Sequence, residues 1–150
     1  MRILFWNCRG IGNAASVNEL LELVRTHRPV VLCIVETQIS KERVEGLRFV
    51  LSYDHCFAVK SDGRSGGLAI YWNNDLSLKV LKFSQVVIDA EIREAGKEPW
   101  RVSCFYGVAD RRFRFRTWDT MKILKADSDL PWVCIGDFNE VLNRCEQLGA

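Results

Sequence analysis

Short apolar runs that end in polar residues limit this chain to a fold built around β-sheet. The runs at 30–35 and 132–135 are continuously apolar and too short for a typical helix, and each follows a proline, as expected of strands covered on both faces. Similar runs, also expected to be strands, lie at 3–6, 56–59, 68–72, 76–83, 86–92 and 100–106.

Three segments between these runs carry apolar residues at helical spacing and a candidate N-cap. We expect one helix to begin near Ser16 or Asn18 and to end before Pro29, a second to begin after Ser40, and a third to begin after Asp110. This order of strands and helices predicts an α/β fold with a mixed sheet. At 150 residues, without a repeat or a linker, the chain is expected to form a single domain over residues 1–150.

Four polar side chains stand where strongly apolar runs end: Asn7, Glu36, Tyr106 and Asp137. If the four strands are neighbours, these tips form one polar rim, which is where open α/β sheets bind ligands. Asn139 follows Asp137 at i+2, so an extended backbone would direct both side chains to the same side. A strand often ends in a polar residue without any function, but four such tips together favour a functional site.

The residues that are missing narrow the chemistry of such a rim. The sequence has no Ser-His pair with a nucleophile elbow, no His cluster and no paired cysteines, which argues against acyl transfer and zinc chemistry. Carboxylates and carboxamides are hard oxygen ligands that suit Mg²⁺ or Mn²⁺. They therefore favour metal-assisted hydrolysis of a phosphate ester, in which Asn side chains donate to phosphate oxygens and Asp137 orients or deprotonates a water.

Composition and cysteine usage indicate the compartment. The six cysteines are scattered, and Cys33, Cys104 and Cys134 lie inside apolar runs, where a cysteine acts as a small hydrophobe. The sequence has neither a signal peptide nor an apolar stretch near the ~20 residues of a membrane span. We therefore expect an intracellular protein of the nucleus or cytoplasm. Its net charge of +2 neither requires nor excludes a nucleic-acid partner.

Five short motifs resemble, in order and rough spacing, those of the endonuclease/exonuclease/phosphatase superfamily. Together they span most of the chain: Trp6-Asn7-Cys8-Arg9-Gly10, Val35-Glu36-Thr37, Ser65-Gly66-Gly67-Leu68-Ala69, Phe105-Tyr106-Gly107 and Ile135-Gly136-Asp137-Phe138-Asn139-Glu140. Within that superfamily the chain looks most like the apurinic-endonuclease-like domain of plant non-LTR (LINE) retrotransposons. Each motif alone is a weak signal, whereas five in order are a strong one.

The resemblance implies a DNase I-like, four-layer α/β sandwich that nicks double-stranded DNA with the help of Mg²⁺ or Mn²⁺. It implies that Glu36 is the main metal ligand and that Asn7 beside it holds metal-bound water or phosphate. Tyr106 would hydrogen-bond the phosphate, Asp137 would position or activate the attacking water, and Asn139 would hold Asp137 and the phosphate. In such retroelements the nick primes reverse transcription, so the implied partner is the reverse transcriptase domain of the same element.

The sequence departs from the superfamily pattern at two places. Repair-type apurinic endonucleases carry an Asp two residues after the first Asn, and because Arg9 occupies that position here, a second carboxylate at the metal is not expected. The superfamily also needs a second half that ends in a Ser-Asp-His triplet, and this sequence ends at Ala150. The Tyr53-Asp54-His55 triplet lies too early, so His55 is expected to be a surface or loop residue. We therefore expect the mixed-sheet half of the sandwich, with its C-terminal part absent, an apolar sheet face exposed and activity impaired.

Two other functions stay open at this point. A non-catalytic remnant that binds DNA or metal weakly is one, because losing the transition-state donor and a metal carboxylate would cost on the order of 10³-fold in rate. The other keeps the fold but hydrolyses an RNA 3′ end, a phosphoinositide or a sphingolipid, because a fold does not select its substrate.

The segment 111–116 alternates basic and aromatic residues and is a candidate nucleic-acid contact. Arg111, Arg112, Arg114 and Arg116 could follow a phosphate backbone while the rings stack on bases. The simpler interpretation is an amphipathic helix start with Phe115 facing the core, and the two interpretations are compatible.

Overall fold

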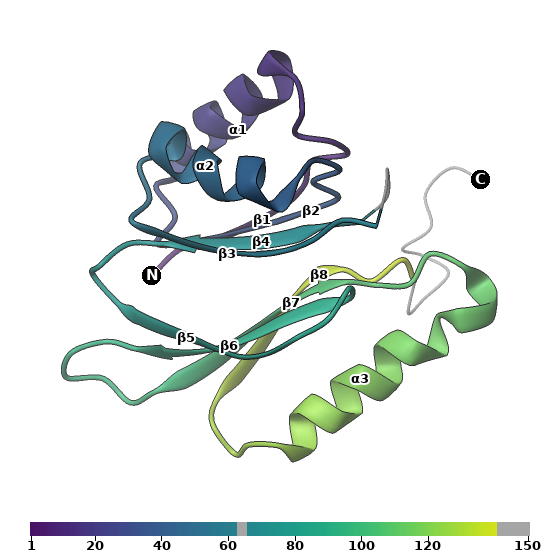
Figure 1. Ribbon diagram of the computed structural model, residues 1–150. Coiled ribbons are helices and arrows are strands. Elements are labelled where there is room, and N and C mark those ends of the chain that lie inside the picture. Colours follow the sequence, from purple (N-terminus) through teal and green to yellow (C-terminus); the bar gives the residue numbers. More distant parts are fainter. Residues whose placement is uncertain (63–65, 141–150) are drawn as a thin grey trace.

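Two β-sheets packed face to face form the centre of the molecule, with helices on both outer sides (Figure 1). The computed structural model describes residues 1–62 and 66–140. The first sheet has the order β1-β2-β4-β3, from strands β1 (Ile3–Asn7), β2 (Val31–Val35), β3 (His55–Val59) and β4 (Leu68–Trp72). The second has the order β5-β6-β7-β8, from β5 (Ser77–Phe83), β6 (Val87–Arg93), β7 (Trp100–Tyr106) and β8 (Trp132–Asp137).

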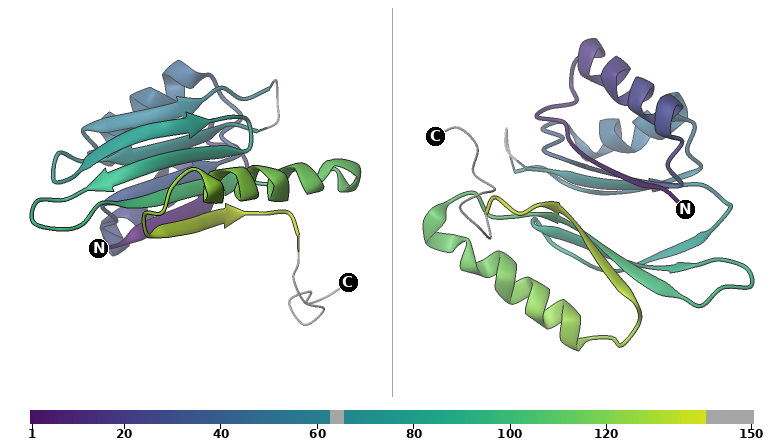
Figure 2. Two further views of the ribbon diagram at one scale, coloured as in Figure 1. Left: turned by 90° about the horizontal axis from the view of Figure 1, so that it is seen from below. Right: turned by 180° about the vertical axis from the view of Figure 1, so that it is seen from behind.

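The helices complete a four-layer arrangement. Helices α1 (Ala14–His27) and α2 (Lys41–Leu51) cover the outer face of the first sheet, and α3 (Phe115–Ala126), preceded by the 3₁₀ helix η1 (Arg111–Phe113), lies along the second (Figure 2). Leu20 of α1 and Val44 of α2 are buried in an apolar cluster with the first sheet. Leu124 of α3 is buried in another cluster with the second sheet. The layers are therefore helices, sheet, sheet and helix, as the resemblance implies.

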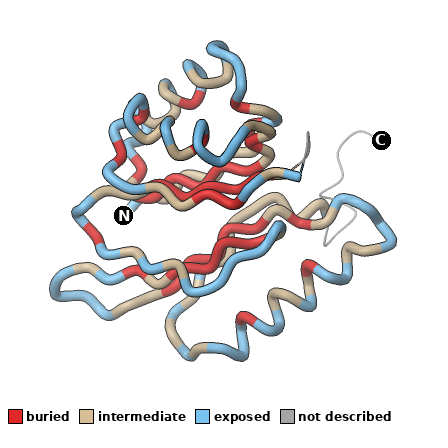
Figure 3. The backbone as a smooth tube through the Cα atoms, viewed as in Figure 1, coloured by how far each residue is buried: buried red, intermediate tan, exposed pale blue. Residues whose placement is uncertain are grey.

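The inner faces of the two sheets bury each other. Val31 and Cys33 of β2 share a cluster with Ile88 of β6 and Cys104 of β7, and all four are fully buried. Figure 3 shows this burial along the central strands of both sheets. The expectation of one exposed apolar sheet face is therefore wrong, because strands β5 to β8 form a second sheet that covers the first.

Helix starts differ from the expected ones in two cases. Asn13 caps α1, with its Oδ1 accepting the N–H of Ser16 at 2.8 Å, so neither Ser16 nor Asn18 is the cap. Ser40 caps α2 as expected, accepting the N–H of Arg43. Asp110 caps η1 rather than α3, which begins without a side-chain cap.

The parallel pairs place four strand ends on the same side of the molecule. β1 pairs with β2 in parallel, with Asn7 opposite Val35, and β7 pairs with β8 in parallel, with Tyr106 opposite Asp137. The carboxyl ends of all four strands point the same way (Figure 1). Edge strands β1 and β8 therefore end beside each other, and the rim predicted from the sequence exists.

The remaining expectations concern single residues and segments. Cys8, Cys33, Cys56, Cys104 and Cys134 are free thiols, and Cys145 lies outside the described residues, as does Ser65 of the third motif. His55 is exposed, as expected, although it lies in β3, where it stacks on Trp72. No helix in the described part of the chain is long and apolar enough to cross a membrane.

Candidate functional site

Two hydrogen bonds join the sheets at the rim and bring the four strand tips together. Asn7 Nδ2, at the end of β1, donates to Asp137 Oδ2, at the end of β8, over 3.0 Å. The Tyr106 hydroxyl, at the end of β7, donates to Glu36 Oε1, just beyond β2, over 2.8 Å. Each bond therefore crosses from one sheet to the other, and we call Asn7, Glu36, Tyr106, Asp137 and Asn139 the rim site.

Glu36 is held by the loop that follows β1. Its carbonyl accepts the Gly10 N–H at 2.7 Å and the Cys8 thiol at 3.3 Å, and the Cys8 N–H donates to the carbonyl of Val35. Burial raises the pKa of Cys8 to about 11, so at neutral pH this thiol stays protonated and acts as a donor. The loop thus fixes the backbone from which the Glu36 carboxylate projects.

Backbone strain in the described chain concentrates at the rim. Six non-glycine residues have positive φ, and two of them, Arg28 and Ser52, are ordinary left-handed helix C-caps. The other four lie in the turns that follow β1, β2 and β8: Arg9, Glu36, Gln38 and Asn139. Such conformations cost free energy and cluster at functional sites, where the surrounding contacts hold them in place.

Asn7 is oriented by two contacts. Its Oδ1 accepts the backbone N–H of Arg9 at 3.1 Å, which leaves Nδ2 to donate to Asp137. The hydrogen-bond network thereby assigns the amide orientation. A second lone pair on Oδ1 stays available for a cation or a water-bound proton.

Asp137 accepts one hydrogen bond on each carboxylate oxygen, from Asn7 and from the backbone N–H of Asn139 at 3.1 Å. The extended geometry expected for Asp137 and Asn139 is wrong, because β8 ends at Asp137 and Asn139 turns to φ 52°. The side chain of Asn139 instead donates to the carbonyl of Gly107 at 2.7 Å and ties the two loops together.

Tyr106 is a neutral donor at ordinary pH. Burial, together with the hydrogen bond to Glu36 and the negative charges of Glu36 and Asp137, raises the pKa of Tyr106 to about 12. Its hydroxyl therefore keeps its proton and can donate to an anionic oxygen.

The rim site fits a hard cation that needs few protein ligands. The described residues contain no group of three or more His, Cys, Asp or Glu that could hold a metal. Glu36 and Asp137 supply carboxylate oxygens and Asn7 a carboxamide oxygen, within one hydrogen-bonded cluster. Mg²⁺ usually keeps several waters and binds through one or two carboxylates plus substrate phosphate oxygens, so this donor set suits Mg²⁺ and does not suit zinc.

Two glycines that the sequence motifs contain have a packing role that residue types alone did not reveal. A Cβ on Gly107 would lie 2.3 Å from the carbonyl oxygen of Phe138, and a Cβ on Gly136 would lie 2.3 Å from that of Phe105. β7 and β8 therefore approach closely at the rim only because both positions lack a side chain. In the sequence, this close approach is indicated by the position of each glycine beside a polar tip, with Gly107 after Tyr106 and Gly136 before Asp137.

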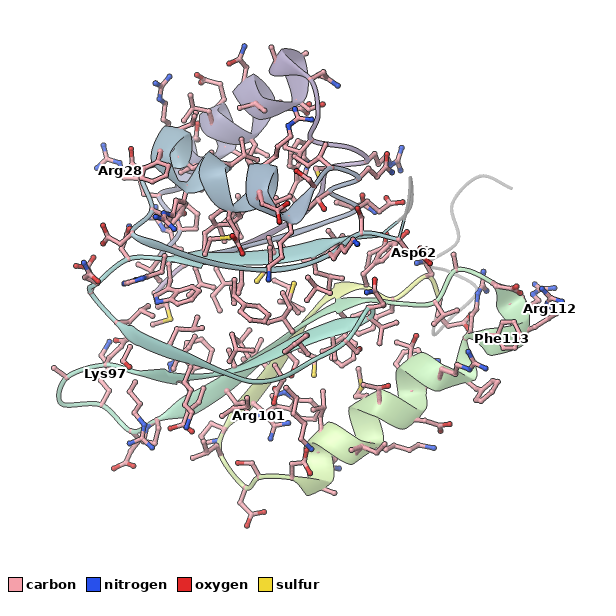
Figure 4. All side chains as sticks on the ribbon, in the orientation of Figure 1. Arg28, Asp62, Lys97, Arg101, Arg112 and Phe113 are labelled. Atoms are coloured by element: carbon pink, nitrogen blue, oxygen red, sulfur yellow. The ribbon has the colours of Figure 1, made fainter. Side chains whose placement is uncertain are left out.

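The basic segment 111–116 lies beside the rim, at the start of α3 (Figure 4). The guanidinium carbons of Arg112 and Arg116 lie 5.3 and 4.5 Å from the centre of the Phe113 ring, and Arg114 pairs with Glu140 at 3.5 Å. Phe115 is 55% exposed, so the expectation that it faces the core is wrong. The helix instead packs through Met121 and Leu124.

Known structures show the same architecture. The chain matches a 3′ phosphatase from Neisseria bound to a product DNA hairpin (TM-score 0.69, 17% identity, 96% of this chain and 60% of that one). It also matches an AP endonuclease from Archaeoglobus fulgidus (0.67, 20%, 96% and 60%) and the endonuclease domain of TRAS1, a telomere-specific non-LTR retrotransposon (0.64, 14%, 93% and 59%). These likenesses confirm the DNase I-like α/β fold, and the chain spans about three-fifths of each structure.

Sequence comparison adds the family. No curated protein matches the chain significantly. The model of the endonuclease/exonuclease/phosphatase family matches residues 4–144, a range that begins in β1 and includes every residue of the rim site. The chain therefore belongs to the endonuclease/exonuclease/phosphatase family.

Proposed function

We propose that this chain carries the metal-binding and water-positioning part of a phosphodiesterase that nicks double-stranded DNA. The observation that carries the proposal is the pair of cross-sheet hydrogen bonds that gathers two carboxylates, a carboxamide and a neutral phenol at one rim. Mg²⁺ or Mn²⁺, held by Glu36 and Asn7, would supply Lewis-acid polarisation of the phosphate.

The protein groups have complementary roles in this proposal. Tyr106, kept neutral by its raised pKa, donates to a non-bridging phosphate oxygen once its bond to Glu36 is exchanged. Asp137, an acceptor on both oxygens, orients a water for in-line attack and takes its proton. Asn139 keeps Asp137 in place through its backbone N–H and fixes the Gly107 loop through its side chain.

DNA is the proposed substrate because the basic segment lies next to the rim. Arg111 and Arg116 are exposed and add positive charge where a duplex bound at the rim would extend, whereas Arg112 and Arg114 pair with Asp110 and Glu140. The similarity to the TRAS1 domain supports a retroelement role, in which the nick primes reverse transcription and the partner is the reverse transcriptase domain of the same element.

The proposal is tested by comparing substrates under single-turnover conditions with the protein in excess. Supercoiled plasmid, single-stranded RNA and an inositol polyphosphate are incubated with the protein in Mg²⁺ and, in parallel, in EDTA. We expect the plasmid to give nicked circles in Mg²⁺ but not in EDTA. Cleavage of the RNA and release of phosphate from the inositol polyphosphate should be slower or absent. Preferential release of phosphate from the inositol compound would reject DNA as the substrate.

The basic segment gives a separate prediction about DNA affinity. Replacing Arg111 and Arg116 by Gln removes two exposed charges. The negative slope of log K against log salt concentration should therefore become shallower by about two. Fluorescence anisotropy with a labelled duplex at several salt concentrations measures it. Arg93→Gln combined with Lys97→Gln, an equal loss of two charges at exposed positions of the far hairpin, is the control and should leave the slope unchanged (Figure 4). Equal effects from both proteins would show that the segment only contributes net charge.

A further inference from the structure

A pocket of about 270 Å³ opens beside the rim site, between the two sheets' loops. Asp62 and Gly66, which lie between β3 and β4, form one wall, and Gln85 and Val86 in the β5–β6 turn form another. Tyr106 and the segment 107–109 that follows it complete the lining. Asp62 lies at this rim in Figure 4. The pocket therefore adjoins the proposed phosphate site through a shared residue, Tyr106.

Tyr106 connects the two places geometrically. Its hydroxyl is bonded to Glu36 in the rim site, while the residue also lines the pocket. A phosphate held at Tyr106 would thus have its neighbouring substituent at the pocket mouth. The substrate group that is bonded to this phosphate would therefore enter the pocket.

The chemistry of the walls selects among the possible occupants. Val86, Val108 and Ala109 carry apolar side chains, and Gln85 carries an amide that can both donate and accept. The described walls thus combine apolar side chains with one amide, which suits a group that has flat apolar faces and a polar edge.

We propose that this pocket is the subsite for the nucleobase next to the reacting phosphate, with Gln85 contacting the edge of the base and Val86, Val108 and Ala109 lining its faces. A nucleobase has apolar faces and a polar edge of donors and acceptors, which is the combination that these walls present. The inference deepens the proposed function and rests on it, because it names the part of the substrate that this site recognises.

Binding of small ligands in Mg²⁺ tests the subsite separately from catalysis. The probes are inorganic phosphate, deoxyribose 5-phosphate and the four deoxynucleoside 5′-monophosphates, titrated by isothermal calorimetry. We expect the nucleotides to bind about tenfold more tightly than deoxyribose 5-phosphate, because the base adds contacts in the pocket.

Two substitutions at exposed positions assign that gain to the pocket. Ala109→Trp fills it and should abolish the advantage of the nucleotides while leaving phosphate affinity unchanged. Gln85→Ala should reduce the differences among the four bases. Ala95→Trp, the same change at an exposed position in the far hairpin, should behave as the unmodified protein.

The outcomes separate the two proposals. If all phosphate compounds bind and the base adds nothing, or if Ala109→Trp keeps the nucleotide advantage, the subsite is wrong and the proposed function stands. If neither phosphate nor nucleotide binds in Mg²⁺, the proposed function itself fails.

Discussion

Replacing Asp137 by Asn is expected to slow Mg²⁺-dependent nicking by about 10²- to 10⁴-fold, the range typical of a lost general base. Asn is nearly the same size and can still accept a hydrogen bond on its oxygen, but it cannot take a proton at neutral pH. The substitution therefore removes the proposed chemistry and keeps one of the two hydrogen bonds from Asn7 and Asn139, because Asn has a single acceptor oxygen. The rate is measured from supercoiled to open-circular plasmid under single-turnover conditions.

The matched control for this substitution is Asp129→Asn. Asp129 is exposed in the loop before β8, away from the rim, so its loss of charge should leave the rate unchanged. The melting temperatures of both variants show whether the fold survives. A correctly folded Asp137→Asn protein that nicks at the original rate would rule out Asp137 as the group that activates water.

The second large effect concerns stability, at a charged pair far from the rim. Arg101 of β7 is fully buried and its Nε donates to Asp89 Oδ1 over 2.9 Å, while the same oxygen accepts the Ser103 hydroxyl at 2.6 Å. Arg101 also donates to the carbonyl of Leu124 and lies over the ring of Trp132, so it links α3 to the second sheet (Figure 4). Arg101→Met should lower the free energy of unfolding by about 3–5 kcal/mol, because it leaves the Asp89 carboxylate buried and unpaired.

Urea denaturation followed by tryptophan fluorescence measures that loss. Lys82→Met is the control, because Lys82 pairs with Asp127 at 2.5 Å in an exposed position, where a salt bridge contributes only about 0–1 kcal/mol. The double variant Arg101→Met with Asp89→Leu should recover part of the lost stability, since it removes the unpaired charge as well. Equal losses from Arg101→Met and Lys82→Met would contradict the structural role of the buried pair.

Local patterns in the sequence predicted most of the individual elements. β4 and β7 have the predicted bounds, and α2 follows its predicted cap at Ser40. These features depend on neighbouring residues alone, namely a continuous apolar run or an N-cap followed by helical spacing. The sequence does not indicate Asn13 as the cap of α1, because Ala14 and Ala15 after it carry no apolar residue at helical spacing that would mark the first turn.

The division of the strands between two sheets was not predictable in the same way. β4 and β6 are both largely buried strands, yet β4 pairs with β2 and β3 in one sheet while β6 pairs with β5 and β7 in the other. Which sheet a strand joins depends on contacts between distant residues, and the alternation of apolar and polar residues does not encode it. The expectation of a single exposed sheet face failed for this reason.

The rim residues were predictable, but their connections were not. Apolar runs that end in Asn7, Glu36, Tyr106 and Asp137 indicated the rim, and the structure brings these four side chains together. The pairing of tips from opposite sheets could not be read from the sequence, nor could the left-handed turns at Glu36 and Asn139, because non-glycine residues give little local signal for positive φ.

The central claim, that the rim site binds a divalent metal for phosphodiester hydrolysis, is tested most directly by the nicking assay with Glu36→Gln beside Glu22→Gln. Glu36 is the proposed main ligand, whereas Glu22 is an exposed carboxylate on α1 whose side chain is 72% accessible. We predict that Glu36→Gln in Mg²⁺ falls to the rate seen in EDTA, while Glu22→Gln matches the unmodified protein. A Glu36→Gln protein that is folded and nicks in Mg²⁺ at the unmodified rate would contradict the claim.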